Sequence, residues 1–188
     1  TEVKLFDGRT MQEIPLPDMG DINITGLTFD HDESAIAFYA SSSSVPSDLF
    51  YLDLDSWLGD DLAQSGLAIR QLTSSLNENI NPAHLVEGEV VRFASFDGLE
   101  IPGILYMPKE ASPDNKVPAL LWVHGGPGGQ SRMGYFGLVQ YLVNHGYAVY
   151  AINNRGSSGY GKTFFHLDDK LHGSVDLDDC VWSKQMLI

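Results

Sequence analysis

An uninterrupted apolar run that ends in a glycine-rich turn is the feature of this sequence that most constrains its fold. Residues Ala119 to Val123 read A-L-L-W-V, and His124 to Gln130 follow as H-G-G-P-G-G-Q. Five apolar residues without a polar break are typical of a strand that is buried on both faces of a parallel sheet. The sequence therefore predicts an α/β fold, with this strand near its centre and a nearly side-chain-free loop at the strand's C-terminal end.

The glycine-rich loop is also the first candidate site. Ligands of open α/β sheets bind outside the carboxyl ends of the strands, and glycines let backbone N–H groups approach a ligand closely. Such N–H groups suit a developing oxyanion, as they do in the corresponding loop of esterases. A tight structural turn is the alternative interpretation of the same residues.

Composition excludes several classes of function. The 188 residues include 11 Lys and Arg against 25 Asp and Glu, a net charge of −14. This argues against nucleic acid and anionic membrane surfaces as partners, because both attract basic patches. No apolar run approaches the ~18 residues of a membrane span. No cofactor is implied, and the single cysteine, Cys180, excludes an internal disulfide framework.

Both ends of the chain suggest a piece of a longer polypeptide. Thr1 is not an initiator methionine, and Met186-Leu187-Ile188 is an apolar stop in a predicted helix. We therefore expect the remainder of the same polypeptide to be a partner. Unpaired strand edges would also favour a homo-oligomer or edge-strand self-association. We favour a cytoplasmic location without assigning one, since a signal peptide would precede Thr1.

Residues 1–75 predict short β-strands separated by turns. The predicted strands are Val3–Phe6, Glu13–Leu16, Ile24–Phe29, Ala35–Ala40, Leu49–Leu54 and Ala68–Thr73. The last four lie within roughly fifty residues, which matches one propeller blade. We interpret residues 1–75 as the end of a β-propeller, about one blade, and the polar residues 76–88 as a linker. A small β-sandwich is the alternative.

Residues 89–188 predict a second domain of the α/β class. The predicted elements are a hairpin of Val90–Phe96 and Ile101–Met107, the strand Ala119–Val123, a helix Met133–His145, a buried strand Tyr147–Ile152 and a last helix with Ser174 as N-cap. The last helix carries an apolar stripe of Leu177, Cys180, Val181, Leu187 and Ile188. Cys180 on that stripe is expected to be an inert buried thiol. This order matches the first half of an α/β-hydrolase sheet.

A second glycine-rich segment matches the P-loop pattern. Gly156 to Thr163 reads G-S-S-G-Y-G-K-T, which satisfies G-x-x-x-x-G-K-[ST] in full. A nucleotide-binding module at these residues is therefore an alternative function. The pattern requires a helix to start at once, and residues 163–173 carry no clear apolar stripe. No later strand ends in an Asp for magnesium, so we rank this alternative low.

Five sequence blocks together resemble the prolyl oligopeptidase family of serine peptidases, most of all its acylaminoacyl-peptidase and dipeptidyl-peptidase branches. The blocks cover about residues 85–188 and read D-G-L-E-I-P-G-I-L-Y-M-P, W-V-H-G-G-P-G-G-Q, N-H-G-Y-A-V, N-N-R-G-S-S-G-Y-G-K and H-G-S-V-D-L-D-D-C-V. The resemblance implies a propeller followed by an α/β-hydrolase domain, and short peptides as substrates. It also explains the P-loop pattern, because the family carries that segment without binding nucleotides there.

The resemblance implies roles for four residues. It makes a backbone N–H in the first glycine loop an oxyanion donor, with Gly126 as the first candidate and Gly125 as its neighbour. His124 falls where some branches place an oxyanion tyrosine, and is a weak candidate for binding substrate. Arg155 matches the arginine of the N-x-R-G block, where a structural anchor is favoured over contact with substrate.

The catalytic triad of such an enzyme is not found in the 188 residues. Hydrolase triads run Ser, then Asp or Glu, then His, with the serine in G-x-S-x-G. That motif is absent, and Ser131, Ser157 and Ser158 lack the required glycines. We expect the triad after Ile188, in a parent serine peptidase of which this chain alone is inactive. An esterase of the same fold is a further alternative, and so is a non-catalytic interaction fragment.

Overall fold

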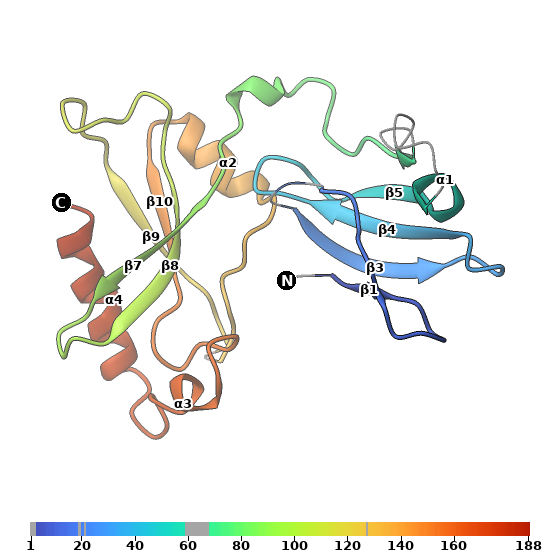
Figure 1. Ribbon diagram of the computed structural model, residues 1–188. Helices are drawn as coiled ribbons and strands as arrows, with labels where there is room; N and C mark the ends of the chain where they lie inside the picture. The colour runs from blue at the N-terminus through green and yellow to red at the C-terminus, as the bar shows by residue number, and fades with distance from the viewer. Residues whose placement is uncertain (1–2, 19, 21, 59–67, 127) are drawn as a thin grey trace. The chain divides into compact units, whose positions relative to one another are not determined.

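The computed structural model of the chain describes residues 3–18, 20, 22–58, 68–126 and 128–188 (Figure 1). Pro127 of the first glycine loop and part of the predicted propeller segment therefore lie outside the described residues. The chain divides into two compact units, Thr1–Ile80 and Asn81–Ile188. Each unit has its own hydrophobic core, so each is described by itself.

The first unit is built from antiparallel strands. Strands β1 (Leu5–Phe6) and β2 (Glu13–Ile14) form a two-stranded sheet. A second sheet contains β3 (Asn23–Phe29), β4 (Ala35–Ser41), β5 (Asp48–Asp53) and β6 (Ile69–Gln71), which pair in sequence order. The short helix α1 (Leu54–Leu58), which the sequence analysis did not predict, follows β5. The four strands of the larger sheet correspond to four of the predicted strands, with bounds within two residues.

The core of the first unit lies on one face of this sheet. Ile36, Phe38 and Ala40 alternate along β4 and are buried together with Leu52 of β5, because every second residue of a strand faces the same side. The rings of Phe38 and Phe50 stack with their centroids 5.8 Å apart. These contacts join the two central strands of the sheet.

The sheet of the second unit is mixed. Its strands β7 (Glu89–Ala94), β8 (Glu100–Tyr106), β9 (Ala119–Val123) and β10 (Ala148–Ile152) lie in the order β7-β8-β10-β9. The pairs β7–β8 and β8–β10 are antiparallel. The pair β9–β10 is parallel, with helix α2 (Gly137–Asn144) between its strands in the chain. The predicted hairpin and the buried strand β10 are therefore confirmed.

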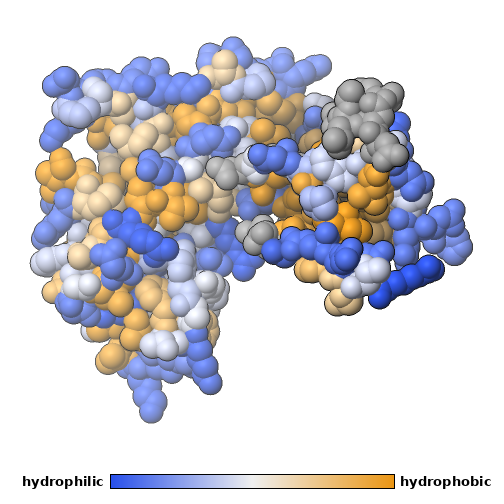
Figure 2. Space-filling view, viewed as in Figure 1, coloured by the Kyte–Doolittle hydropathy of each residue, from blue (hydrophilic) through white to orange (hydrophobic). Residues whose placement is uncertain are grey.

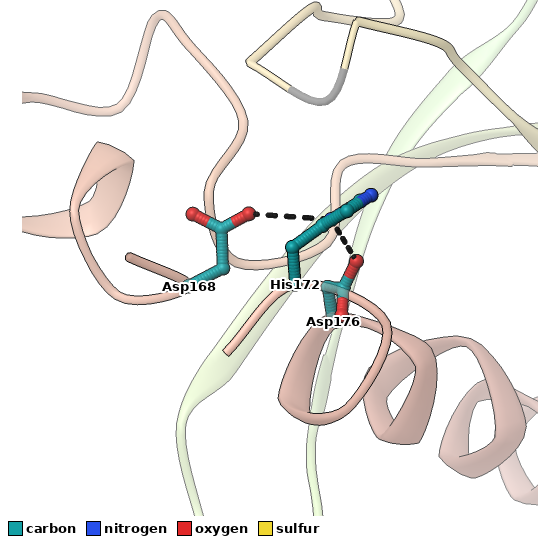
Figure 3. Close-up of side chains that lie close together, drawn as sticks. All are labelled: Asp168, His172 and Asp176. Carbon is teal, nitrogen blue, oxygen red and sulfur yellow. Dashed lines mark ion pairs between the residues drawn. The ribbon is translucent and has the colours of Figure 1, made fainter. Parts of the chain in front are cut away.

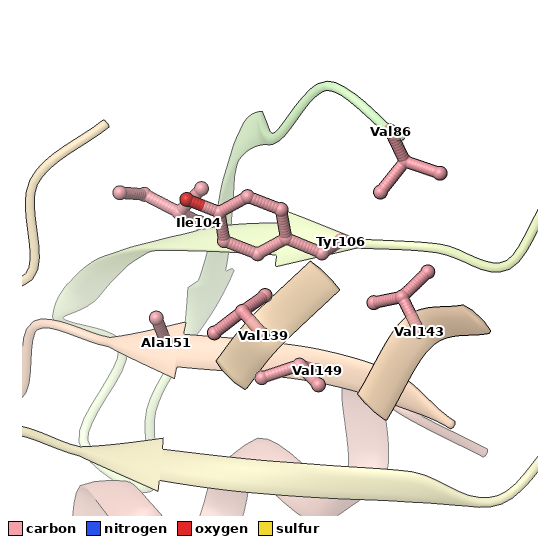
Figure 4. Close-up of a cluster of buried hydrophobic side chains, with 7 residues drawn as sticks. All are labelled: Val86, Ile104, Tyr106, Val139, Val143, Val149 and Ala151. Carbon is pink, nitrogen blue, oxygen red and sulfur yellow. The ribbon is translucent and has the colours of Figure 1, made fainter. Parts of the chain in front are cut away.

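Helices cover both faces of this sheet. Val149 and Ala151 of β10 pack with Val139 and Val143 of α2 in one core cluster (Figure 4). The alternate residues of β10 face the other side, where residues of helix α4 (Val175–Met186) pack around Tyr150. The second unit thus has three layers, and the carboxyl ends of β9 and β10 lie next to each other at one edge.

Residues 81–88 pack with the second unit. The 3-10 helix η2 (Pro82–His84) opens this segment. Val86 is buried in the α2-side core, and its N–H and C=O both bond to the side-chain amide of Gln140, at 3.0 and 2.8 Å. The segment 76–88 that the sequence analysis treats as a linker is therefore divided between the two units at Ile80.

Two predictions about burial were wrong. β9 is half-exposed rather than buried on both faces, with Val123 52% exposed, because β10 is its one partner strand within the described residues. The predicted apolar stripe of α4 also reaches the surface at Leu177, Val181 and Ile188. The helix instead buries Asp176, Asp179 and Ser183, which form polar contacts. Hydrophobic side chains accordingly appear at the surface of both units (Figure 2).

The ends of the two main helices differ in part from the prediction. α2 begins at Gly137 rather than at Met133, and it ends at Asn144 before Gly146, whose φ of +85° suits a glycine stop. Ser174 occupies the N-cap position of α4 but its side chain makes no capping bond. Asp176 accepts the Gly173 N–H at 2.7 Å instead. Among the described helices, none is both long and apolar enough to span a membrane.

Candidate active site at the glycine loops

Two loops meet at the carboxyl edge of the parallel strand pair. One follows β9 and includes His124 to Ser131, and the other follows β10 and includes Asn153 to Gly161. The side chain of Asn153 accepts the Ser131 N–H at 2.7 Å and donates to the Ser131 carbonyl at 3.0 Å. Ser158 N–H donates to the Gly129 carbonyl at 2.9 Å. These bonds hold the first glycine loop against the second.

The predicted oxyanion donors lie in the exposed part of the first loop. Gly125 and Gly126 are both exposed, and within the described residues neither backbone N–H has a hydrogen-bond acceptor. Gly126 has φ of +121°, a conformation that a residue with a side chain adopts only with strain. A Cβ at Gly129 would overlap the Gly125 carbonyl oxygen, so the loop closes tightly on itself. The loop thus presents two N–H groups whose bonding capacity is unused.

His124 and Ser157 form a pair that resembles a nucleophile with its base. His124 Nε2 lies 2.8 Å from Ser157 Oγ. However, Ser157 Oγ also lies 2.6 Å from the Asn154 carbonyl, which accepts its proton. The hydrogen-bond network therefore places a proton on Nε2 of His124, and this N–H donates to Ser157 Oγ. Ser157 is fully buried, so the pair is a structural link between the two loops, with the polarity opposite to that of a catalytic dyad.

Arg155 is buried and held by two carboxylates. Its Nε and Nη2 donate to Asp179, and its Nη1 and Nη2 donate to Asp97, all at 2.9 to 3.0 Å. Asp179 is fully buried, and it also accepts the backbone N–H of Arg155 and the hydroxyl of Ser95. The guanidinium carbon lies 4.5 Å from the centroid of the Phe96 ring. The arginine thus joins the β7–β8 turn, the β10 loop and α4.

Protonation states follow from this arrangement. Burial alone would lower the pKa of the Arg155 guanidinium, but its bonds to Asp179 and Asp97 outweigh burial and raise it. The hydrogen bonds from Arg155 lower the pKa of Asp97 below its ordinary value. Arg155 and Asp97 are therefore both charged near neutral pH. Since the donors of Arg155 are directed to these acids, its position favours the anchor interpretation over contact with substrate.

The P-loop pattern does not form a phosphate cradle. The N–H groups of Gly156, Ser157 and Ser158 donate to backbone carbonyls of Phe164, Asn154 and Gly129. Helix α3 (Lys162–Phe165) has only four residues, too short for a dipole that supports a nucleotide. The geometry therefore argues against the nucleotide-binding alternative.

Cys180 has the character of an inert thiol. Burial, together with the charges of Asp179 and Asp176, raises the pKa of its thiol to about 11. A thiol with so high a pKa carries almost no thiolate near neutral pH, and the thiolate is the nucleophilic form. The expectation that Cys180 is not a nucleophile agrees with this environment.

The structure brings together three polar side chains that the sequence analysis did not combine. Asp168, His172 and Asp176 have ligand atoms that all lie within 4.8 Å of one another (Figure 3). Their spacing of four and four residues is the signal that could have found them, although residues 166–174 form turns rather than a helix.

The comparisons with known proteins agree on one family. Residues 134–188 match a family model described as the prolyl oligopeptidase family. The dipeptidyl aminopeptidase BIII of Pseudoxanthomonas mexicana is 33% identical over 175 residues, which cover 87% of this chain and 23% of that protein.

Two solved structures share the fold. A Mycobacterium tuberculosis puromycin-hydrolyzing peptidase matches with a TM-score of 0.77 at 21% identity, over 98% of this chain and 27% of that one. The acylaminoacyl peptidase of Pyrococcus horikoshii matches with a TM-score of 0.68 at 25% identity, over 97% and 26%. The chain thus spans about a quarter of the length of these proteins.

Proposed function

Because the chain is related to the prolyl oligopeptidase family, we propose that it is part of a serine peptidase that hydrolyses short peptides. In this proposal the second unit is the first half of an α/β-hydrolase domain, and the first unit is the end of a β-propeller. Similarity to a dipeptidyl aminopeptidase and to an acylaminoacyl peptidase supports a peptide as the substrate class.

The observation that carries this proposal is the pair of N–H groups at Gly125 and Gly126, which have no acceptor in the part of the chain that the structure describes. In acyl transfer, a serine Oγ attacks the scissile carbonyl while a histidine takes the serine proton, and the carbonyl oxygen becomes an oxyanion. Backbone N–H groups that are already fixed in place stabilise this charge, because they do not reorganise during the reaction. Hydrogen bonds with Asn153 and Ser158 hold the loop that contains Gly125 and Gly126 in place.

The proposal places the nucleophile, the acid and the histidine after Ile188. No G-x-S-x-G occurs among the 188 residues, and the best candidate pair, His124 with Ser157, has the wrong polarity and is buried. The chain covers about a quarter of the length of these relatives, so the triad can lie in a part of the parent polypeptide that corresponds to the uncovered length. The chain alone would then be inactive.

The exposed edge of β9 supports the remainder of the polypeptide as a partner. An open hollow of about 420 Å³ lies beside β9 and α4, and its lining is mainly apolar. Leu177 and Val181 line it, and both are more than half exposed. Asn154 also lines it, and its buried Oδ1 has no hydrogen-bond donor in the described part of the chain. A neighbouring strand would cover these residues.

The substitution Gly126→Pro in the polypeptide that contains the triad tests the proposal. Proline has no N–H, so the variant lacks the donor, but its ring also holds φ at about −65° where Gly126 has +121°. Gly126→Ala keeps the N–H and strains the same backbone, so it separates the loss of the donor from distortion of the loop. The loss of one oxyanion donor is expected to lower kcat by about 10²–10³ with a smaller change in KM, because the donor acts mainly on the transition state. A peptide substrate with a chromogenic leaving group provides the measurement.

Two controls make the result specific. Gly134→Ala lies just beyond the same loop, where a Cβ meets open space, and should leave kcat unchanged. Gly125→Pro separates the two candidate donors, and melting curves report whether each variant folds. Normal folding of Gly126→Pro with parental turnover would exclude Gly126 as the donor. Labelling of the 188-residue chain itself by a fluorophosphonate serine probe would overturn the placement of the triad after Ile188.

A further inference from the structure

The cluster of Asp168, His172 and Asp176 lies apart from the glycine loop that carries the proposed function. Asp168 follows α3, Asp176 is in the first turn of α4, and His172 lies in the turns between them. His172 Nδ1 is 2.7 Å from Asp176 Oδ2 and 3.8 Å from Asp168 Oδ2. Figure 3 shows both carboxylates directed toward the imidazole ring from opposite sides.

Asp168 is the unusual member of the cluster. It is only 8% exposed, and within the described residues no hydrogen-bond donor lies within bonding distance of its carboxylate. Its nearest cationic group is His172, at 3.8 Å, and that side chain is 61% exposed. Burial removes most of the hydration of this carboxylate, and the imidazole at 3.8 Å is too distant to replace it with a hydrogen bond. A cation bound beside it would supply the missing partner.

The Asp168 carboxylate packs closely against the backbone of the second glycine loop. A Cβ at Gly156 would overlap the Asp168 carboxyl group, so the carboxylate packs directly on the backbone of the second glycine loop. Gly156 also has φ of +91°, which a residue with a side chain adopts only with strain. The carboxylate is therefore fixed in place with its free oxygen directed toward His172.

We propose that Asp168, His172 and Asp176 bind one divalent transition-metal ion of the Zn²⁺ class. One imidazole nitrogen and two carboxylate oxygens are a ligand set that zinc accepts, with water completing a tetrahedron. Tetrahedral zinc with bonds near 2.1 Å separates its ligand atoms by about 3.4 Å. The distances of 2.7 and 3.8 Å lie on either side of that separation. The two carboxylate oxygens lie within 4.8 Å of each other, so each ligand atom needs to move by about 1 Å or less to reach a tetrahedral arrangement.

A bound ion would have a structural effect on the proposed active-site region. It would tie the start of α4 to the turns after α3, and through Asp168 it would sit beneath the loop that contains Gly156. The site is a support for the loop and takes no part in acyl transfer.

Titration of the metal-stripped chain with ZnCl₂ by calorimetry tests this inference. We expect one equivalent of Zn²⁺ to bind and the melting temperature of the second unit to rise. CoCl₂ should give visible d–d absorption of the intensity that four-coordinate cobalt shows. His172→Ala should weaken binding by at least about tenfold, the effect that even outer-shell partners of a metal have.

His166→Ala is the matched control. His166 Nδ1 lies 2.8 Å from Asp169 Oδ2, so this pair has the same chemistry and a comparably exposed histidine, but its aspartate is exposed and it has no third ligand within the described residues. The variant should bind Zn²⁺ with parental affinity. Absence of binding at millimolar Zn²⁺, or equal affinity in the parent chain and His172→Ala, would overturn the site.

Asp168→Asn separates a metal ligand from a purely structural carboxylate. The amide removes an uncompensated buried charge, so the metal-free variant should be at least as stable as the parent while the stabilisation by Zn²⁺ is lost. A purely structural role through the ion pair with His172 predicts the reverse, a less stable variant whose response to Zn²⁺ is intact. That result would contradict the proposal.

Discussion

Arg155 shows how differently two carboxylates act on one buried cation. Asp179 is completely buried, whereas the side chain of Asp97 is 42% exposed. Removal of one partner from a buried pair leaves an uncompensated charge, which costs about 3–5 kcal/mol. A partly exposed partner is replaced by water, and such pairs contribute about 1 kcal/mol or less.

We therefore expect Asp179→Asn to lower the free energy of unfolding of the second unit by about 3–5 kcal/mol. Asp97→Asn should lower it by about 1 kcal/mol or less. Urea unfolding followed by circular dichroism measures both values. Equal effects from the two substitutions would show that burial does not decide the strength of these pairs.

Asp48, at the start of β5, binds the segment that follows β6 in the first unit. Its Oδ1 accepts bonds of 2.8 Å from the Thr73 hydroxyl and from both the hydroxyl and the N–H of Ser75. Burial alone would raise the pKa of this carboxyl, but these bonds and one from Gln71 outweigh burial and lower it. The folded state therefore binds the proton at Asp48 more weakly than the unfolded state does.

This shift gives a pH dependence with a definite sign. The pKa of Asp48 is lower in the folded state than in the unfolded state. Its stabilisation of the fold is therefore complete at pH values above the pKa of the unfolded state. This stabilisation is lost as the pH falls through the pKa that Asp48 has in the folded state. We expect the melting temperature of the first unit to fall below about pH 4, and to fall less steeply in Asp48→Asn. Asp7 and Asp30, whose pKa values are also lowered, remain in both proteins. Identical slopes in both proteins would contradict this account.

At the scale of elements, β8 and β10 depend on one glycine. A Cβ at Gly103 of β8 would overlap the ring of Tyr150, which is fully buried in β10. Neither the sheet backbone nor the ring can move freely, since Tyr150 also contacts Phe93 edge to face. Overpacking of this kind costs about 1–3 kcal/mol.

Gly103→Ala should therefore destabilise the second unit by about 1–3 kcal/mol in urea unfolding. Gly134→Ala is the control within the same unit, because a Cβ there meets nothing within 4 Å and φ is not in the left-handed region. A neutral Gly103→Ala would mean that the sheet adjusts more easily than close packing allows.

The sequence predicted best the elements whose hydrophobic pattern matches their burial in the structure. β10 is apolar throughout and is covered by helices on both faces, so its burial follows from its composition. β9 has the same pattern, but its burial depends on a neighbour that composition does not reveal. The last helix was misjudged because its inward residues include two acids, Asp176 and Asp179. The partners of Asp179, Ser95 and Arg155, come from distant parts of the sequence.

Some parts of the candidate site could be predicted from the sequence and others could not. Glycine content located the loop that carries Gly125 and Gly126. The pairing of His124 with Ser157 was not predictable, because it joins residues 33 positions apart across two loops. The ligand atoms of Asp168, His172 and Asp176 converge through turns, and turns have no fixed periodicity from which a shared face could be inferred.

At the scale of the whole molecule, the chain has two sets of cores that share no residues. The core of the first unit contains residues between Leu5 and Ile69, and the two cores of the second unit contain residues between Val86 and Leu187. Residues that share a core unfold together, so each unit is expected to unfold in its own cooperative transition.

We therefore expect two separable unfolding transitions, each altered by substitutions in one unit only. Asp48→Asn should lower the first unit's stability by about 1.5–3 kcal/mol, the contribution of hydrogen bonds to a charged group, and leave the second unit unchanged. Gly103→Ala should do the reverse. Hydrogen exchange read by mass spectrometry assigns each transition to peptides on either side of Ile80, where the units divide. If both variants shifted the exchange of peptides from both units equally, the chain would unfold as one cooperative body, and the separate cores would not define its energetics.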